Sequence, residues 1–342
     1  MEIIDREKKN IIFIILILIT VFVLCISIGT VYIPFLEIWK VILKKLFNLN
    51  LAFQGLNYEE IIYYVRLPRV LVGCLVGGGL ALSGAVMQSV FKNPMADAGI
   101  LGISSGASLG AVITIALGLT AKSMIYMPVM AIICSFVLGM IVYKLSSYRG
   151  RTSTLTLILS GVAMSTLVGA IISLIITNIS EHQMKEYVFW SMGSLVGRRW
   201  EHVHLIAIPI ILISFYIMRY SRELNILLLG DEESHSLGIN PNKFRKKILF
   251  LASVIVALGV CVSGYIGFVG LIIPHITRMI VGANNKIVLP VSFLSGGIFL
   301  MVCDLFARTL FSPTEISVGI ITSILGAPYF IYLLLKSRKE EF

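Results

Sequence analysis

The sequence contains few charged residues: only 13% of its 342 residues are Asp, Glu, Lys or Arg, against about 25% in soluble globular proteins. Hydrophobic residues make up 57% of the chain and form continuous runs of about 20 residues, the length that crosses a bilayer as a helix. Membrane-spanning strands would alternate polar and apolar residues, so continuous runs indicate helices. The sequence therefore predicts an all-α polytopic membrane protein.

The sequence also lacks motifs that would give this chain chemistry of its own. No Gly-x-x-x-x-Gly-Lys-[Ser/Thr] loop is present, which excludes ATP binding by that route, and no His-Glu-x-x-His zinc motif occurs. The five cysteines lie within apolar runs and lack the spacing of metal ligands. We therefore expect no enzyme activity, no metal site and no bound cofactor in this chain.

The net charge of +10 does not indicate nucleic-acid binding, because the basic residues are spread over many loops. The basic start of the chain instead places the N-terminus in the cytoplasm, and no cleavage site follows residues 11–31, which we interpret as a retained first span. An even number of spans brings the C-terminus to the same side. The apolar runs predict about ten transmembrane helices, over residues 11–31, 64–91, 95–119, 124–145, 155–178, 203–218, 248–266, 270–283, 287–307 and 315–335.

Residues 219–247 form the longest polar interruption and divide the single transmembrane domain into a first half, 1–218, and a second half, 248–335, before the tail 336–342. The loop carries six basic and four acidic residues, with short helical patterns on both sides of Gly230 and Gly238. A solvated surface loop would leave its run of leucines at 227–229 unexplained. We therefore interpret this loop as the docking platform of a motor subunit.

The segment Asn93-Pro94-Met95 predicts a helix break at a membrane end, because proline removes a backbone donor and disfavours helix at the preceding residue. Asn93 is placed to cap the next helix, and a broken helix here is a candidate gate. Glycines at spacings of three and four follow, and they favour close helix packing: Gly99, Gly102, Gly106 and Gly110.

Residues 80–94 and 260–274 share a Ser-Gly pair followed by a proline at the same offset, Pro94 and Pro274. Since the two copies run in opposite directions in the ten-span topology, they indicate an inverted repeat of the kind that builds transporters. His275 and Arg278 follow on one helical face. A structural hydrogen-bonded pair is favoured there over a proton relay.

Charges near the outer membrane surface have two interpretations. Asp304 and Arg308 are four residues apart, the spacing of an intrahelical ion pair. Arg308 could equally join Arg66 and Arg69 in a basic cluster that receives an acidic partner. The residues alone leave both interpretations open.

Taken together, these motifs resemble the permease family of bacterial ABC importers for iron–siderophore complexes, haem and cobalamin, the FecCD-type or type II importers. The matching segments are RLPRVLVG, ALSGAVMQSVFKNPMADAGILGISSGA, LLLGDEESHSLGI, SGYIGFVGLIIPHITR and DLFARTLFSPTEISVGIITSILGAPYFIYLLLK, and they extend over residues 66–335. Departures are small: Ser317 replaces the usual proline, Met95 the usual leucine and Ser234 the usual alanine.

The resemblance implies a homodimer in the bacterial cytoplasmic membrane, embedded in lipid, with both termini cytoplasmic and a pathway at the dimer interface. It implies docking of an extracytoplasmic binding protein at Arg66, Arg69 and Arg308, and a cytoplasmic gate at Asn93, Met95, Thr152 and Ser153. Two cytoplasmic ATPase subunits would carry the ATP and Mg²⁺. They would dock on the loop residues Leu229, Gly230, Asp231, Glu232, Glu233, Ser234, Leu237 and Gly238.

The main alternative is a secondary carrier driven by protons or sodium through Asp97, His275 or Asp304. The cargo is not encoded in any recognisable ligand set. Iron–siderophore is ranked above haem and cobalamin only because it is the commonest cargo of the family that the sequence resembles.

Overall fold

The structure is a computed structural model, and it describes residues 2–29, 31–47, 57–97, 99, 102–123, 125–148, 151–152 and 154–340. This part of the chain is helical apart from one hairpin of two-residue strands, β1 (Ser147–Tyr148) and β2 (Arg151–Thr152). The predicted all-α fold is confirmed.

Ten apolar helical segments correspond to the ten predicted spans within the described residues. Six are long and apolar enough to cross a membrane, and four are shorter apolar helices. The ten segments lie in α1 (Glu2–Ser27), α3–η1–α4 (Tyr58–Glu60, Ile61–Arg66, Leu67–Phe91), α5 (Ile103–Ala116), α6 (Tyr126–Ser146), α7 (Thr154–Ile176), α9 (Trp200–Met218), α12 (Pro241–Ser263), α13 (Val269–Val281), α14 (Asn285–Thr309) and α15 (Val318–Glu340).

Helix α4 forms the centre of the bundle, and most of its residues are buried. Small residues allow neighbouring helices to reach its backbone. A Cβ atom added to Gly84 would lie 1.8 Å from the carbonyl oxygen of Gly270 in α13, and one added to Gly77 would lie 2.3 Å from that of Gly296 in α14. These approaches require glycine on α4.

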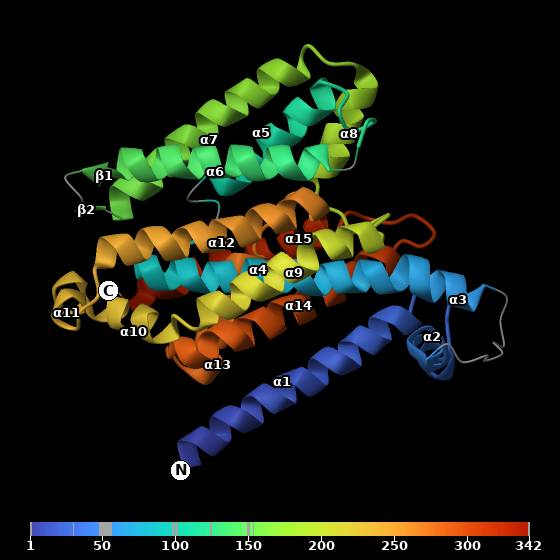
Figure 1. Cartoon of the computed structure of the whole chain (residues 1–342), viewed down its shortest axis with the longest axis horizontal. Helices are drawn as coiled ribbons and strands as arrows, with labels where there is room; N and C mark the ends of the chain where they lie inside the picture. Colours follow the sequence, from blue (N-terminus) through green and yellow to red (C-terminus); the bar gives the residue numbers. More distant parts are fainter. Residues whose placement is uncertain are drawn as a thin grey trace.

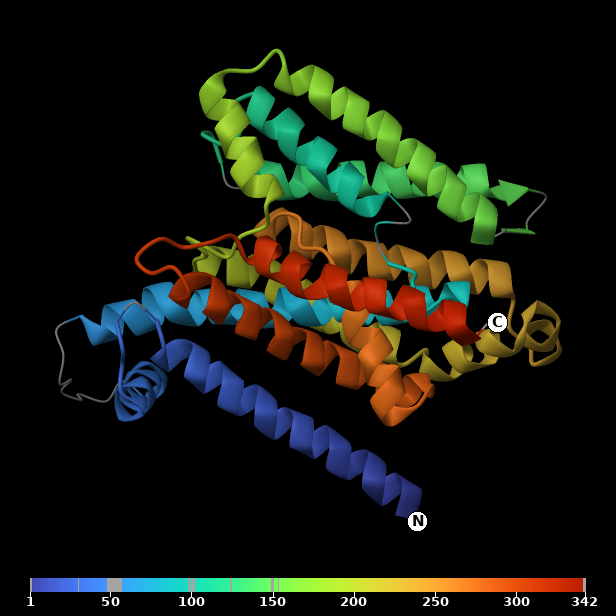
Figure 2. The ribbon, with the colours of Figure 1, turned by 180° about the vertical axis from the view of Figure 1, so that it is seen from behind.

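Helices α5, α6 and α7, with the short helix α8 (Glu181–Ser191), form a layer of their own beside α12 and α4 (Figures 1 and 2). The contacts between this layer and the rest of the bundle are made chiefly by α6 and α5 against α12. On the other side of the bundle, α1 packs against α14. Both termini lie at the same end as α10 (Ser221–Leu229) and α11 (Asp231–Ser236), whereas α2 (Phe35–Phe47) and α8 lie at the opposite end (Figure 1).

The helix order supports the inverted repeat. Helices α4 to α7 contain 25, 14, 21 and 23 residues, and α12 to α15 contain 23, 13, 25 and 23. Both short helices begin after a residue with positive φ, Gly102 (68°) or Phe268 (69°), and α4 and α12 run in opposite directions (Figure 1). The residue register of the predicted repeat is wrong, because Ser83 lies inside α4 whereas Ser263 is the last residue of α12.

Candidate functional site

Helices α10 and α11 form a protruding pair at one end of the bundle (Figure 1). Leu224 and Leu227 anchor α10 with no exposed surface, whereas Leu229 is 63% exposed and Leu237, which follows α11, is 58% exposed. Gly230 joins the two helices with φ 148°, and a Cβ atom there would lie 2.0 Å from Glu233 Oε2. The predicted platform thus has a buried base and an exposed apolar tip.

An ion pair holds the start of α11 in place, and further carboxylates surround the apolar tip. Asp231 pairs with Arg245 at the start of α12, at 2.5 and 2.9 Å. The hydrogen bonds from Arg245 lower the pKa of Asp231 below its ordinary value. Glu232 and Glu233 are exposed, while Ser234 is buried and its hydroxyl donates to the Gly230 carbonyl. Gly238 ends the pair with φ 83°. The surface offers binding contacts and no nucleophile–base arrangement.

A polar network ties α10 to three membrane helices. Asn225 of α10 donates to Asn284 Oδ1 (2.8 Å) and accepts from the backbone N–H of Asn285 (2.9 Å). The Asn285 side chain is fully buried, and its Oδ1 accepts from Ser89 of α4 (2.8 Å) and from Arg278 of α13 (3.2 Å). Arg278 also donates to the Ser89 hydroxyl at 2.7 Å. A displacement of α10 would therefore act directly on α4, α13 and α14.

The predicted gate segment begins at Asn93, four residues after Ser89. Helix α4 ends at Phe91, and Asn93 Oδ1 accepts from the Met95 N–H at 2.8 Å. The expectation that Asn93 caps the next helix is wrong: α5 begins at Ile103, after Gly102 in a left-handed conformation. Asparagine instead closes a short turn around Pro94, because its side chain mimics a backbone acceptor.

The other predicted gate residues belong to the loop before α7. Thr152 lies in β2, opposite Ser147, at the same end of the bundle as α11 (Figure 1). Ser153 lies outside the described residues. The positive charge of Lys92, at the end of α4, contributes to the lowered pKa of Asp231 in α11.

Some of the residues predicted to pack helices together do so in the structure, and others do not. Gly106 and Gly110 of α5 face the α6 backbone, where added Cβ atoms would lie 2.7 Å from Cys134 O and 2.4 Å from Met130 O. Gly99 precedes the helix, and an added Cβ atom there would meet nothing within 4 Å, so it does not belong to this face. Pro274 lies inside α13 rather than at a break, with His275 half-buried beside it.

The three predicted docking arginines lie in one cluster at the opposite end, but they are buried. Arg69 is 7% exposed and donates to both oxygens of Asp304 (2.9–3.1 Å) and to Glu315 Oε2 (2.8 Å). Arg66, at the end of the π-helical turn η1, donates to the backbone carbonyls of Ile26, Ser27 and Val31.

Arg308 completes the cluster. It donates to the Cys25 carbonyl and lies 3.8 Å from Asp304, so the intrahelical ion pair and the arginine cluster both exist. An acidic partner would have to compete with the acceptors that these side chains already have. Docking of a partner on the arginines therefore stays a prediction, and stabilisation of the fold is their visible role.

Sequence reasoning missed Asn225, Asn285, Ser89 and Glu315. The adjacent asparagines at 284–285, between two apolar runs, were the available signal, because amides at a helix start cap it. Asn284 does so for α14, with its Oδ1 accepting from Lys286 N–H. Among the described residues, no group of three or more His, Cys, Asp or Glu side chains is placed to hold a metal ion.

The protein is a polytopic helical membrane protein with an inverted repeat. It has a protruding helix pair at one end and a buried ionic cluster at the other. This is the organisation of a transporter's membrane subunit. Residues 16–336 match the FecCD transport family. The chain belongs to that family, and it is the permease component of an ABC importer.

Two relatives and one structure illustrate the likeness. The chain is 44% identical over 279 residues to the cobalamin import system permease protein BtuC of Halobacterium salinarum, covering 81% of this chain and 73% of the relative. It is 40% identical over 281 residues to the hemin transport system permease protein HmuU of Yersinia pestis, covering 81% and 84%. A solved metal-chelate type ABC transporter in an inward-facing conformation matches with a TM-score of 0.84 at 34% identity, covering 96% and 99%.

Proposed function

We propose that this permease imports an iron–siderophore complex across the cytoplasmic membrane, driven by ATPase subunits that dock on α10 and α11. The observation that carries the proposal is the protruding helix pair: Leu229 and Leu237 are exposed beside a row of carboxylates, on a base held by Leu224 and Leu227. An exposed apolar tip of this kind is typical of a surface that a partner covers. ATP and Mg²⁺ belong to that partner.

Transmission to the membrane pathway follows the polar network. Closure of the ATPases would move α10, and Asn225 would pass that displacement to Asn285, Ser89 and Arg278. The end of α4 and the turn at Asn93 lie immediately beyond Ser89 and act as the inner gate. Two copies of the chain form the pathway between them, and both termini face the cytoplasm, on the side of α11.

The opposite end receives the cargo. A substrate-binding protein docks there, over the segment that Arg66, Arg69 and Arg308 hold in place. We place iron–siderophore complexes first because they are the commonest cargo of the family that the sequence resembles. Haem and cobalamin, the cargoes in the names of the two relatives above, are the alternatives.

The docking surface is tested by co-purifying the permease with its ATPase after the substitution Leu229→Asp or Leu237→Asp. Both leucines are exposed, so we expect a folded permease that no longer retains the ATPase. Val196→Asp is the matched control, because Val196 is 48% exposed in the segment between α8 and α9, away from α10 and α11. Normal ATPase retention by both leucine variants would refute docking on this pair.

A further inference from the structure

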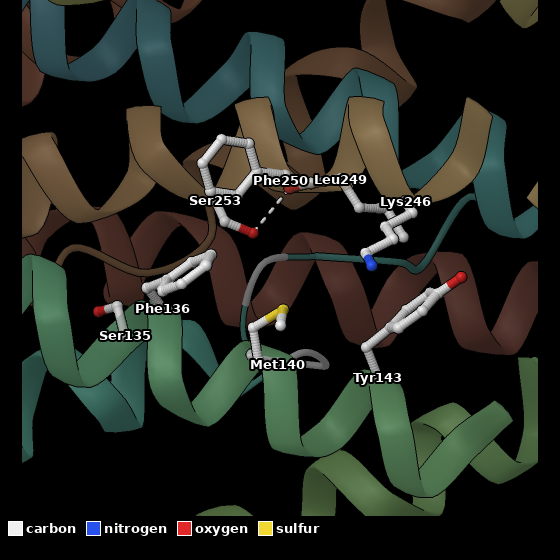
Figure 3. A pocket seen from close by; sticks show the side chains of 9 residues that line it. Ser135, Phe136, Met140, Tyr143, Lys246, Leu249, Phe250 and Ser253 are labelled. Atoms are coloured by element: carbon white, nitrogen blue, oxygen red, sulfur yellow. Dashed lines mark hydrogen bonds between the residues drawn. The ribbon is translucent and has the colours of Figure 1, made fainter. Parts of the chain in front are cut away.

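A groove runs between α6 and α12, where the α5–α8 layer meets the rest of the bundle. Its first hollow has about 200 Å³ of space, and a second of about 210 Å³ continues it along the same two helices. The two hollows share Ser135, Phe136, Phe250 and Ser253, so they form one elongated groove. Figure 3 shows the first hollow between the two helices.

The body of the groove is apolar. The rings of Phe136 and Phe250 meet edge to face across it, with centroids 5.3 Å apart. The hydroxyls of its serines are already used: Ser135 donates to Ile103 O (2.8 Å) and Ser253 to Leu249 O (2.7 Å). The occupant of this section is therefore a hydrocarbon chain.

One end of the groove is basic. Lys246 extends from α12 and Tyr143 from α6 toward the same part of the gap (Figure 3). Two neighbouring cations are engaged elsewhere, Arg245 with Asp231 and Lys247 with the Tyr220 hydroxyl. Within the part of the chain that the structure describes, no acidic side chain forms an ion pair with Lys246.

The basic end and the apolar section of the groove lie at the depths where a phospholipid has its headgroup and its acyl chain. Lys246 lies near the start of α12, at the end of the bundle that carries α10 and α11, while the apolar section continues along α12 to Ala257. Basic pockets between transmembrane helices on the cytoplasmic side bind anionic headgroups. A phosphate at Lys246 would leave its acyl chain lying along Phe250 and beyond.

We propose that this groove binds one anionic phospholipid, with its phosphate on Lys246 and Tyr143 and an acyl chain between Phe136 and Phe250. The lipid joins α6 to α12 and thereby bridges the α5–α8 layer and the central helices. Free phosphate does not fit the apolar section, and a zwitterionic lipid offers Lys246 no net negative charge.

The test places a fluorescent reporter in the groove by Phe250→Trp, with the full-length permease reconstituted in phosphatidylcholine vesicles containing one-fifth phosphatidylglycerol. The probe is phosphatidylglycerol with brominated acyl chains, which quenches tryptophan on contact. The unsubstituted protein gives the background from Trp39, Trp190 and Trp200. We expect the reporter to bind brominated phosphatidylglycerol with about fivefold preference over brominated phosphatidylcholine, the factor that one lysine supplies near an anionic headgroup.

In the reporter background, Lys246→Gln should remove that preference, whereas Lys243→Gln should retain it, because Lys243 is exposed one turn away and does not line the groove. Equal quenching by the two brominated lipids would overturn the proposal. Equal effects of the two lysine variants would also overturn it, since they would indicate bulk surface attraction. Complete protection of the reporter from both lipids would show that protein, not lipid, covers the groove.

Discussion

The substitution Asp304→Asn tests what the buried arginine cluster does. Asp304 is 3% exposed and accepts hydrogen bonds from Arg69: the Nε–H donates to both carboxylate oxygens, and Nη2 donates to Oδ1. Asparagine keeps the shape of the side chain but removes its charge. Arg69 would then retain only Glu315 as an ionic partner, and the side chain of Glu315 is 30% exposed.

The expected cost follows from burial. Removing one partner of a buried ion pair costs roughly 3–5 kcal/mol, because the other charge stays buried without compensation. A pair whose acid is partly solvated contributes about 0–1 kcal/mol, so Glu315→Gln should have little effect. Replacing both Arg69 and Asp304, by Arg69→Met with Asp304→Leu, should restore part of the stability, since no charge remains at position 69, whereas Arg308 still loses its carboxylate partner.

Thermal unfolding of the detergent-solubilised permease, followed by intrinsic fluorescence, compares the four proteins. We expect the apparent midpoint of Asp304→Asn to fall by on the order of 5–10 °C, with Glu315→Gln within a few degrees of the unsubstituted protein and the double variant between Asp304→Asn and the unsubstituted protein. If Asp304→Asn unfolds no earlier than Glu315→Gln, the cluster does not stabilise the fold, and an external partner becomes the better explanation of its charges.

Three further predictions concern α10, α4 and α11. Asn225→Ala removes the link to Asn285 and should leave ATP hydrolysis intact while lowering the uptake of cargo per ATP hydrolysed, measured in proteoliposomes. Gly84→Ala should destabilise the permease by at least about 1–3 kcal/mol in thermal unfolding, because its Cβ atom would overlap the α13 backbone. The Asp231–Arg245 pair should contribute to ATPase retention at neutral pH and be lost only as the pH falls below the ordinary Asp pKa of about 4, because the pKa of Asp231 is lowered and the carboxylate stays charged down to that lowered pKa.

Matched variants separate these effects from general damage. Ser236→Ala is the control for Asn225, because Ser236 is exposed on α11 and bonds only its own helix at Glu232 O. Gly169→Ala is the control for Gly84, since nothing lies within 4 Å of its added Cβ atom. Unchanged uptake per ATP in Asn225→Ala, or equal losses in the two glycine variants, would contradict the respective argument. The pH prediction would be contradicted if the Asp231→Asn protein lost ATPase retention at acidic pH to the same extent as the unsubstituted protein.

The spans were predictable because lipid selects long apolar helices, and their order revealed the two halves. The residue register of the repeat was not predictable from the sequence. A Ser-Gly pair occurs inside a helix at Ser83 but at the end of a helix at Ser263. The sequence predicts a helix from residue 95, but α5 begins only at Ile103. Proline at 94 marks a break, but the left-handed Gly102, eight residues later, decides where the helix resumes.

The candidate sites were predictable to different degrees. The loop at 229–238 could be predicted as a docking surface, because it is polar and lies between long apolar runs. Burial of Arg66, Arg69 and Arg308 could not be inferred, because their acceptors come from distant segments: the end of α1, Asp304 and Glu315. The Asn225–Asn285–Ser89–Arg278 network likewise joins four helices, and only the packing of those helices brings its members together.

Uptake of radiolabelled ferric siderophore into proteoliposomes tests the central claim most directly. The permease is reconstituted with its ATPase and binding protein, and uptake is followed with and without ATP, with and without the ATPase, and under a proton gradient. An ABC importer permease requires ATP and the ATPase and is insensitive to the gradient. Uptake by the permease without the ATPase, rising with the proton gradient, would contradict the proposed mechanism.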